Sequence, residues 1–312
     1  MSHFSQRNDT SATCVSSDWR DRHILFITIN RRIRTALIAF NSMLILLTLF
    51  LNILSLVTIR KSPQLKNKLC YFVIQVQSAV DVAVGGLSIP ALLVLLVSPF
   101  WVFESCLAFR LLFVSMLAVP SCHPVTLLTL TVERYIGVIH PYLYQTLLTR
   151  EIILLFGIVA CSLCVVSVSL LFFGGVLIAL IFGLLILAFF VFITYAYSRI
   201  YLVVRQLDDS GKRPADSGQP NNASRRRRLF REINHAKSCF IVVIAYCIVL
   251  LPLAFAAIFL ANGVNRGVYV CWLHSLLMLN SSINSVTFFW TKKLLRTEAW
   301  KVIRSIFSQS QF

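Results

Sequence analysis

Seven apolar stretches, each long enough to cross a lipid bilayer as a helix, dominate this sequence. The spans that we expect cover residues 36–59, 69–97, 107–133, 152–173, 176–203, 238–261 and 268–290. A helix needs about 20 apolar residues to span the hydrocarbon core. Because 58% of the 312 residues are hydrophobic and only 13% are charged, one water-soluble domain cannot bury this surface. The continuous runs therefore predict an all-α membrane protein, a seven-transmembrane helix bundle.

Basic residues gather on one side of the predicted spans, which indicates the orientation of the chain. The formal charge of +17 is concentrated in the connections after the first, third, fifth and seventh spans. Cations of membrane proteins favour the cytoplasmic side. We therefore expect a multi-pass protein of the plasma membrane with its N-terminus outside, and the sequon Asn8-Asp9-Thr10 then predicts glycosylation of Asn8.

Three regions follow from this topology. Residues 1–34 form an extracellular segment, residues 35–291 form the membrane domain, and residues 292–312 form an amphipathic helix and a tail. The only long connection is polar and rich in Pro, Gly and Ser, so we expect a flexible third intracellular loop over residues 206–230. In the last region Leu295, Ala299, Ile303 and Phe307 recur every four residues, which predicts a helix that lies against membrane lipids.

Several polar side chains lie inside the apolar spans. Asp81 is near the centre of the second span, where a carboxylate costs at least about 2.5 kcal/mol unless it finds partners. His123 lies at a comparable depth in the third span, and Asn280, Ser281 and Asn284 share one face of the seventh. We expect one buried cluster that holds water, a sodium ion or a proton. The alternative is a set of interhelical hydrogen bonds without an ion.

A second costly group, Arg134, lies at the end of the third span. Glu133 precedes it and Glu232 opens the sixth span, so both acids are candidates for an ion pair with its guanidinium. A pair between the third and sixth helices would hold them together, and its rupture would let them separate. The alternative is an arginine that extends to the membrane interface beside incidental acids.

The order of these residues resembles that of the rhodopsin-like, or class A, G-protein-coupled receptors. The resemblance covers residues 35–307 and is carried by Asn52, Asp81, Glu133-Arg134-Tyr135, Tyr197, Glu232, Pro252 and the run from Asn280 to Asn284. It implies that Glu133, Arg134, Tyr135, Tyr197 and Glu232 control coupling to a heterotrimeric G protein. It also implies a helix-packing role for Asn52, Pro252, Ser285 and Phe288.

The sequence departs from the family pattern in four spans, including the fifth, where Phe189 replaces a proline. The seventh-span signature, Asn-Pro-x-x-Tyr in the family, ends here in Phe288 and has Ser285 in place of the proline. Leu250 stands where the family has a tryptophan in the sixth span. Pro120 and Pro124 remove backbone donors from the third span and should kink it. These differences affect the activation geometry that the resemblance implies.

The outer face resembles the branch that contains the melanocortin, lysolipid, cannabinoid and adenosine receptors. Among nine cysteines, only Cys14, Cys106 and Cys271 should face the oxidising side, so at least one has no partner within the chain. The short connection after the fourth span lacks the cysteine that usually pairs with the top of the third helix. The resemblance therefore favours a Cys14–Cys271 disulfide, since Cys106 lies about a turn before the family position.

The resemblance also places a ligand pocket beside Leu112, Met116, Leu250 and Ala254. Met116 replaces the aspartate of amine receptors, and no lysine occupies the seventh span, so neither an amine nor retinal is expected. An apolar lining suits a lipid, a nucleoside-like molecule or a hydrophobic peptide side chain.

We therefore expect a receptor that transmits an extracellular ligand to a G protein by outward movement of the sixth helix. The alternatives are a receptor-like protein that does not couple and acts as a decoy or heteromer partner, and a transporter, although the sequence has no internal repeat. No nucleophile–base pair and no metal-ligand spacing occurs in the aqueous parts, so we do not expect an enzyme. We expect no nucleic-acid partner, and no cofactor apart from the sodium ion considered at Asp81.

Overall fold

All regular elements in the described part of the chain are helices. The computed structural model describes residues 26–27, 29–98, 106–170, 175–211, 244, 248 and 266–309. The long elements, in chain order, are α2 (Arg31–Lys61), α4 (Leu69–Ala83), α5 (Ile89–Val97), α7 (Cys106–Ala118), α8 (His123–Ile139), α10 (Arg150–Leu170), α11 (Gly175–Gly211), α13 (Arg266–Thr291) and α14 (Lys293–Gln309). The shorter helices are α3 (Pro63–Lys66) and α9 (Pro141–Leu147). The expectation of an all-α protein is thus confirmed for these residues.

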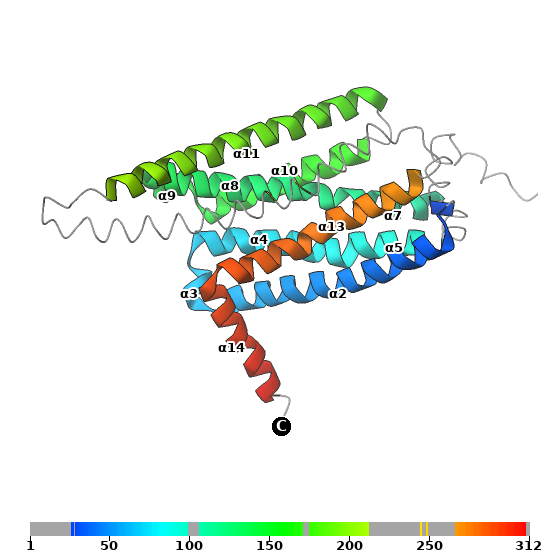
Figure 1. Cartoon of the computed structure of the whole chain (residues 1–312), viewed down its shortest axis with the longest axis horizontal. Coiled ribbons are helices and arrows are strands. Elements are labelled where there is room, and N and C mark those ends of the chain that lie inside the picture. Colours follow the sequence, from blue (N-terminus) through cyan, green and yellow to red (C-terminus); the bar gives the residue numbers. More distant parts are fainter. Residues whose placement is uncertain are drawn as a thin grey trace, which may run out of the picture.

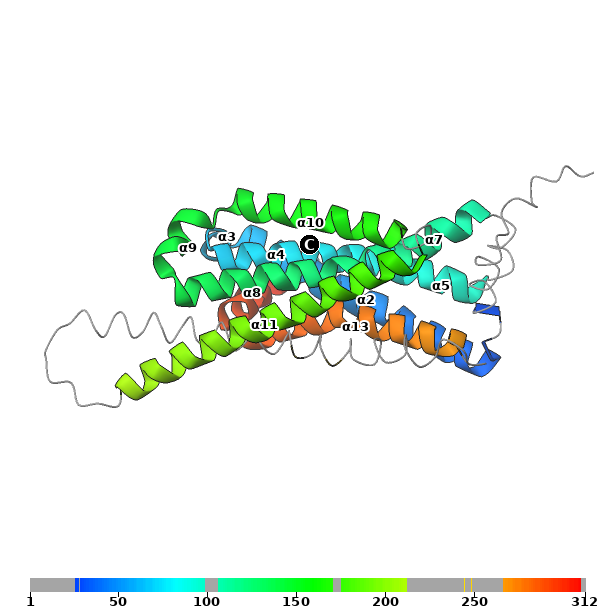
Figure 2. The same ribbon diagram turned by 90° about the horizontal axis from the view of Figure 1, so that it is seen from above.

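The long helices form one elongated bundle (Figures 1 and 2). In it α2 packs between α4 and α13, while α8 packs between α4 and α11. One apolar cluster fills the end near α9 and includes Ile59, Leu127 and Phe288. Another fills the opposite end and includes Leu92 and Met278. The polar residues of the spans lie between these two clusters, so they are enclosed on both sides by apolar packing.

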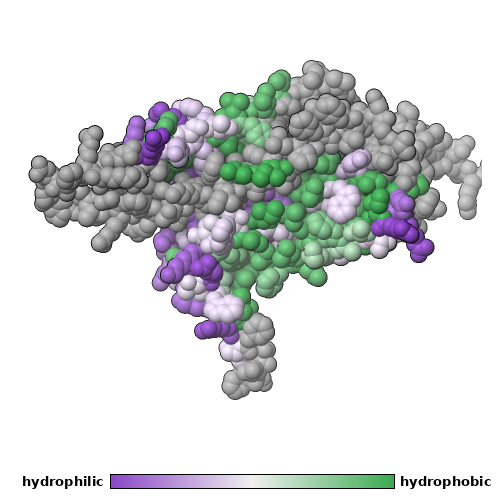
Figure 3. Space-filling model, in the orientation of Figure 1, coloured by the Kyte–Doolittle hydropathy of each residue, from purple (hydrophilic) through white to green (hydrophobic). Residues whose placement is uncertain are grey.

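Three continuous helical segments of the described residues are long and apolar enough to cross a membrane. They cover Arg31–Lys61, Leu69–Val97 and Leu107–Ile139. Large apolar side chains point outward, as at Leu46 (72% exposed) on α2 and Ile158 (62% exposed) on α10. In Figure 3 hydrophobic side chains cover the middle of the visible described surface and hydrophilic ones gather at its ends. Water would disfavour such a surface, so these features indicate a helical membrane protein.

The predicted spans agree with the observed helices to within a few residues, with two extensions. The third helix continues to Ile139 rather than ending at residue 133. α11 continues to Gly211, so residues 206–211 are helical although they fall in the predicted flexible loop 206–230. Polar residues can extend a helix beyond the bilayer because water satisfies its outer surface, and hydropathy alone does not detect this. The sixth predicted span, 238–261, lies outside the described residues except at two helical positions.

Two spans contain a non-α turn at their proline or glycine residues. A π-helical turn, η2 (Val84–Ser88), joins α4 to α5 just before Pro90, which has no backbone N–H to continue the ladder. A 3₁₀ turn, η3 (Pro120–Cys122), joins α7 to α8. The predicted disturbance of the third helix at Pro120 and Pro124 is therefore present, and it immediately precedes His123.

The C-terminal helix α14 leaves the bundle at a steep angle to α13 (Figure 1). Leu295 and Ala299 are buried, and the helix packs against α2. Trp300 is exposed, with the Arg304 guanidinium 5.8 Å from its ring centroid. The predicted helix is thus formed, but two residues of its predicted lipid-facing side, Leu295 and Ala299, pack against the protein instead.

Candidate functional site

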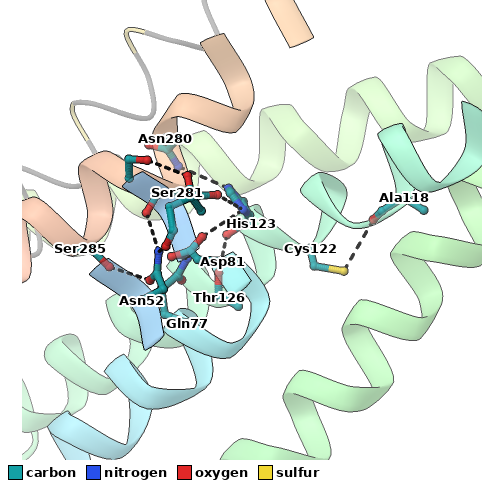
Figure 4. Close-up of polar contacts among 12 residues, drawn as sticks. Asn52, Gln77, Asp81, Ala118, Cys122, His123, Thr126, Asn280, Ser281 and Ser285 are labelled. Carbon is teal, nitrogen blue, oxygen red and sulfur yellow. Dashed lines mark hydrogen bonds and ion pairs between the residues drawn. The ribbon is translucent and has the colours of Figure 1, made fainter. Parts of the chain in front are cut away.

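Asp81 of α4 is the centre of a buried polar cluster (Figure 4). Its side chain is fully buried. Gln77, one turn earlier, donates from Nε2 to both carboxylate oxygens at 3.5 and 3.4 Å. The Nε2 atom of His123 lies 3.2 Å from Asp81 Oδ1. An unpaired buried carboxylate costs several kcal/mol, so these N–H groups lower the free energy of burying Asp81.

His123, the first residue of α8, connects Asp81 to α13. Its Nε2 lies 3.2 Å from Ser281 Oγ, and its Nδ1 lies 3.4 Å from Asn280 Nδ2. With the Asn280 amide nitrogen assigned as donor to Nδ1, the ring hydrogen of His123 is assigned to Nε2, which faces Asp81. The predicted residues Asp81, His123, Asn280 and Ser281 therefore lie together, and they join three helices that are far apart in the sequence.

Asn52 extends the cluster from α13 to α2. Its Nδ2 donates to the backbone oxygens of Thr48 and Ser281 at 2.9 and 3.3 Å, and its Oδ1 accepts from Ser285 Oγ at 2.6 Å. The hydroxyl oxygens of Thr48 and Ser282 lie 2.7 Å apart in the same contact between α2 and α13. Every polar atom of the Asn52 side chain is thus used for packing α2 against α13, which agrees with the packing role expected for Asn52 and Ser285.

Asn284, the fifth predicted member, lies beside the carboxylate without a good hydrogen bond. Its amide interacts with Asp81, but among the described residues neither its Nδ2 nor its Oδ1 reaches hydrogen-bond geometry with any group. Asn280 Oδ1 and Gln77 Oε1 likewise have no hydrogen-bond partner among the described residues. Buried amides without protein partners indicate bound polar molecules, because such groups are rarely left unsatisfied.

A second buried group closes the end of α8. Arg134 is 3% exposed and Glu133 is 1% exposed. The Nε and Nη2 atoms of Arg134 donate to the two carboxylate oxygens of Glu133, which is the fork geometry that a guanidinium offers to a carboxylate. Glu133 is therefore the acid that holds Arg134 among the described residues. Glu232 lies outside them, so a pair with Glu232 stays a prediction.

Tyr144 of α9 completes this group, and our sequence analysis missed it. Its hydroxyl donates to Glu133 Oε1 at 2.7 Å. Burial, and then the negative charge of Glu133, raise the pKa of the Tyr144 phenol, so it stays a donor at neutral pH. Pro141, which begins α9, was the available signal, because it turns the chain back toward α8. No local pattern says which residue of the turned helix meets Glu133.

Tyr135, Tyr197 and Phe288 lie near this group but in different surroundings. Tyr197 of α11 and Phe288 of α13 are both buried in the apolar cluster at this end. The Tyr135 ring lies 6.3 Å from the ring of Tyr195 and 6.1 Å from that of His140. The Tyr135 ring thus contacts Tyr195 of α11 in a tilted arrangement.

The described part of the predicted ligand pocket is apolar. Met116 is 1% exposed and belongs to the apolar cluster at the end of the bundle opposite α9, with Leu112 packed against it. Phe26 enters the same cluster and meets Phe109 and Phe113 edge-on, with ring centroids 6.4 and 6.3 Å apart.

Several predicted residues cannot be placed. Outside the described residues lie Asn8, Cys14, Glu232, Leu250, Pro252 and Ala254. Cys106 begins α7, but its side chain is not among those described. Cys271 is buried and has a free thiol among the described cysteines. The Cys14–Cys271 disulfide therefore stays a prediction.

Comparison with known proteins finds no relative: no protein-family model matches the chain, and no curated protein sequence matches it. The function must therefore be argued from the geometry of these two buried groups.

Proposed function

We propose that this protein is a seven-helix receptor of the rhodopsin-like type that couples an extracellular ligand to a heterotrimeric G protein. One observation carries the proposal above the others. Arg134, at the end of a membrane helix, is buried and held by Glu133, which is held in turn by Tyr144 of the following helix. Burying a cation at the end of a helix bundle costs free energy. A functional role accounts for that cost: the contacts of Arg134 with Glu133 and of Glu133 with Tyr144 form a latch, which is closed at rest and breaks on activation.

The proposed resting state keeps this latch closed. Agonist binding in the apolar region around Met116 favours a state in which α8 and α13 shift relative to each other. The contacts of His123 with Asp81 and Ser281 transmit the shift, because they join α4, α8 and α13 at mid-bundle. Arg134 then leaves Glu133, the sixth helix moves outward, and a G-protein helix enters beside Arg134 and Tyr197. The ligand fills this role only if it binds the open state more tightly.

The test is nucleotide exchange on purified G proteins by the full-length protein in lipid nanodiscs. A panel of G-protein subtypes and of lipid, nucleoside and peptide libraries covers the expected ligand classes. We expect exchange above that of empty nanodiscs for at least one subtype, and its loss in Arg134→Ala. The matched control is Arg150→Ala, which removes a partly buried arginine whose contacts are the backbone oxygen of Lys66 and the ring of Phe72.

A receptor-like protein that does not couple is the second candidate, and Phe288 favours it. Phe288 is 1% exposed in the cluster that contains Tyr197, and it offers no hydroxyl to that tyrosine. The test is nucleotide exchange in the wild type and in Phe288→Tyr. If the wild type stimulates no G-protein subtype and Phe288→Tyr stimulates one, the protein is a receptor-like protein that does not couple.

A further inference from the structure

The charge of Asp81 raises the question of which group neutralises or solvates it. A sodium ion is one of the three occupants that we expect from the sequence at this cluster. A hard cation requires several oxygen ligands around one position.

The first carboxylate oxygen, Oδ1, is already occupied. His123 Nε2 lies 3.2 Å away and Gln77 Nε2 lies 3.5 Å away. Both are nitrogen groups whose hydrogens point toward the carboxylate, so they present positive partial charge where a cation would bind. Oδ2 also accepts from Gln77, at 3.4 Å.

Some of the other oxygens of the cluster are engaged, whereas Gln77 Oε1, Asn280 Oδ1 and Asn284 Oδ1 have no hydrogen-bond partner among the described residues. Asn52 Oδ1 accepts from Ser285 Oγ, and Ser281 Oγ lies 3.2 Å from His123 Nε2. The Asn284 amide interacts with Asp81, but neither its Nδ2 nor its Oδ1 reaches good hydrogen-bond geometry with a described residue. Only a molecule that both donates and accepts hydrogen bonds can satisfy the two ends of this amide. Water does both, whereas a sodium ion can bind only the amide oxygen.

We propose that His123 takes the place of a cation at Asp81, so that this cluster excludes sodium and is completed by water. The imidazole of His123 is the residue that determines this specificity, because it is the group in contact with Asp81, Ser281 and Asn280 at once. A small side chain at position 123 would leave the space and the carboxylate oxygen open to an ion. The inference does not depend on the proposed signalling function, since it concerns binding of an ion to the purified protein.

Thermal unfolding of the full-length protein in nanodiscs tests this proposal. The melting temperature is measured in sodium chloride and in choline chloride at equal ionic strength. We expect the same melting temperature for the wild type in both salts. His123→Ser, which removes the ring and supplies an oxygen, should gain a rise of roughly 2–4 °C in sodium at ten times the dissociation constant. Asp81→Asn in the His123→Ser background should remove that rise.

His274→Ser is the matched control, since it removes another imidazole of the bundle, one whose Nδ1 contacts the backbone oxygen of Val270. It should gain no sodium response. A sodium-specific rise in the wild type that Asp81→Asn abolishes would overturn the proposal, and this measurement needs no His123 variant. Folded His123→Ser protein without a sodium response would equally overturn it, because the ring would then not be what excludes the ion.

Discussion

Replacing Tyr144 by phenylalanine should raise the ligand-independent activity of this protein. The change removes one hydroxyl and keeps the ring, so the packing of α9 on α8 is preserved. It deletes the 2.7 Å hydrogen bond to Glu133, the residue that holds Arg134. A hydrogen bond to a charged group contributes about 1.5–3 kcal/mol, and the partial exposure of Tyr144 favours the lower end of that range.

If the bond is present only in the closed state, its loss shifts the ratio of open to closed protein about tenfold, because about 1.4 kcal/mol corresponds to a factor of ten in an equilibrium constant. Basal nucleotide exchange should rise by that factor while the open state is a minor population. The pKa of Tyr144 is raised by burial and by Glu133, so the wild-type hydroxyl stays protonated. The difference between variant and wild type should therefore be the same throughout pH 6–9.

Tyr142→Phe is the control, because Tyr142 is on the same helix and is 84% exposed. It should leave basal exchange unchanged. The two variants are compared in preparations that have equal melting temperatures and measurable Arg134-dependent activity. Equal basal nucleotide exchange in Tyr144→Phe and Tyr142→Phe would then refute the idea that Tyr144 holds the latch closed.

Two further substitutions test the packing of the bundle. Asn52→Leu removes hydrogen bonds between α2 and α13 and leaves the Ser285 hydroxyl without its acceptor. We expect a loss of about 2–4 kcal/mol of stability, measured as a lower melting temperature. An unchanged melting temperature would show that these hydrogen bonds do not stabilise the contact between α2 and α13. At Gly85 an added Cβ would lie 3.0 Å from Leu49 Cδ2, so Gly85→Val should cost about 1–3 kcal/mol of stability. Gly86→Val should cost less, because a Cβ there meets no neighbouring atom within 4 Å. Equal melting temperatures for the two variants would contradict this packing.

The sequence by itself determined the helical membrane architecture of the described residues. Hydropathy is a local property, so a run of apolar residues identifies a helix and its approximate ends without reference to any other helix. The second predicted span, 69–97, coincides with the observed segment for this reason. Proline chemistry likewise located the disturbance before His123, since the missing N–H is a property of the residue itself.

The membership of the polar cluster was also predictable, although its contacts were not. The cost of placing Asp81 and His123 in lipid indicates that they need partners, and few polar side chains at that depth were available. Sequence reasoning did not find Gln77, one turn from Asp81, although its spacing of four residues was a usable signal.

Only the tertiary structure decided which atoms meet. Asn280 and His123 are 157 residues apart, and Asn52 and Ser285 are 233 apart, so each contact depends on the rotation of two helices about their axes. The contact of Tyr144 with Glu133 depends on how α9 turns back on α8. A one-dimensional pattern gives the buried depth of a side chain, whereas the direction it faces is set by packing between helices. That direction is what places His123 beside Asp81.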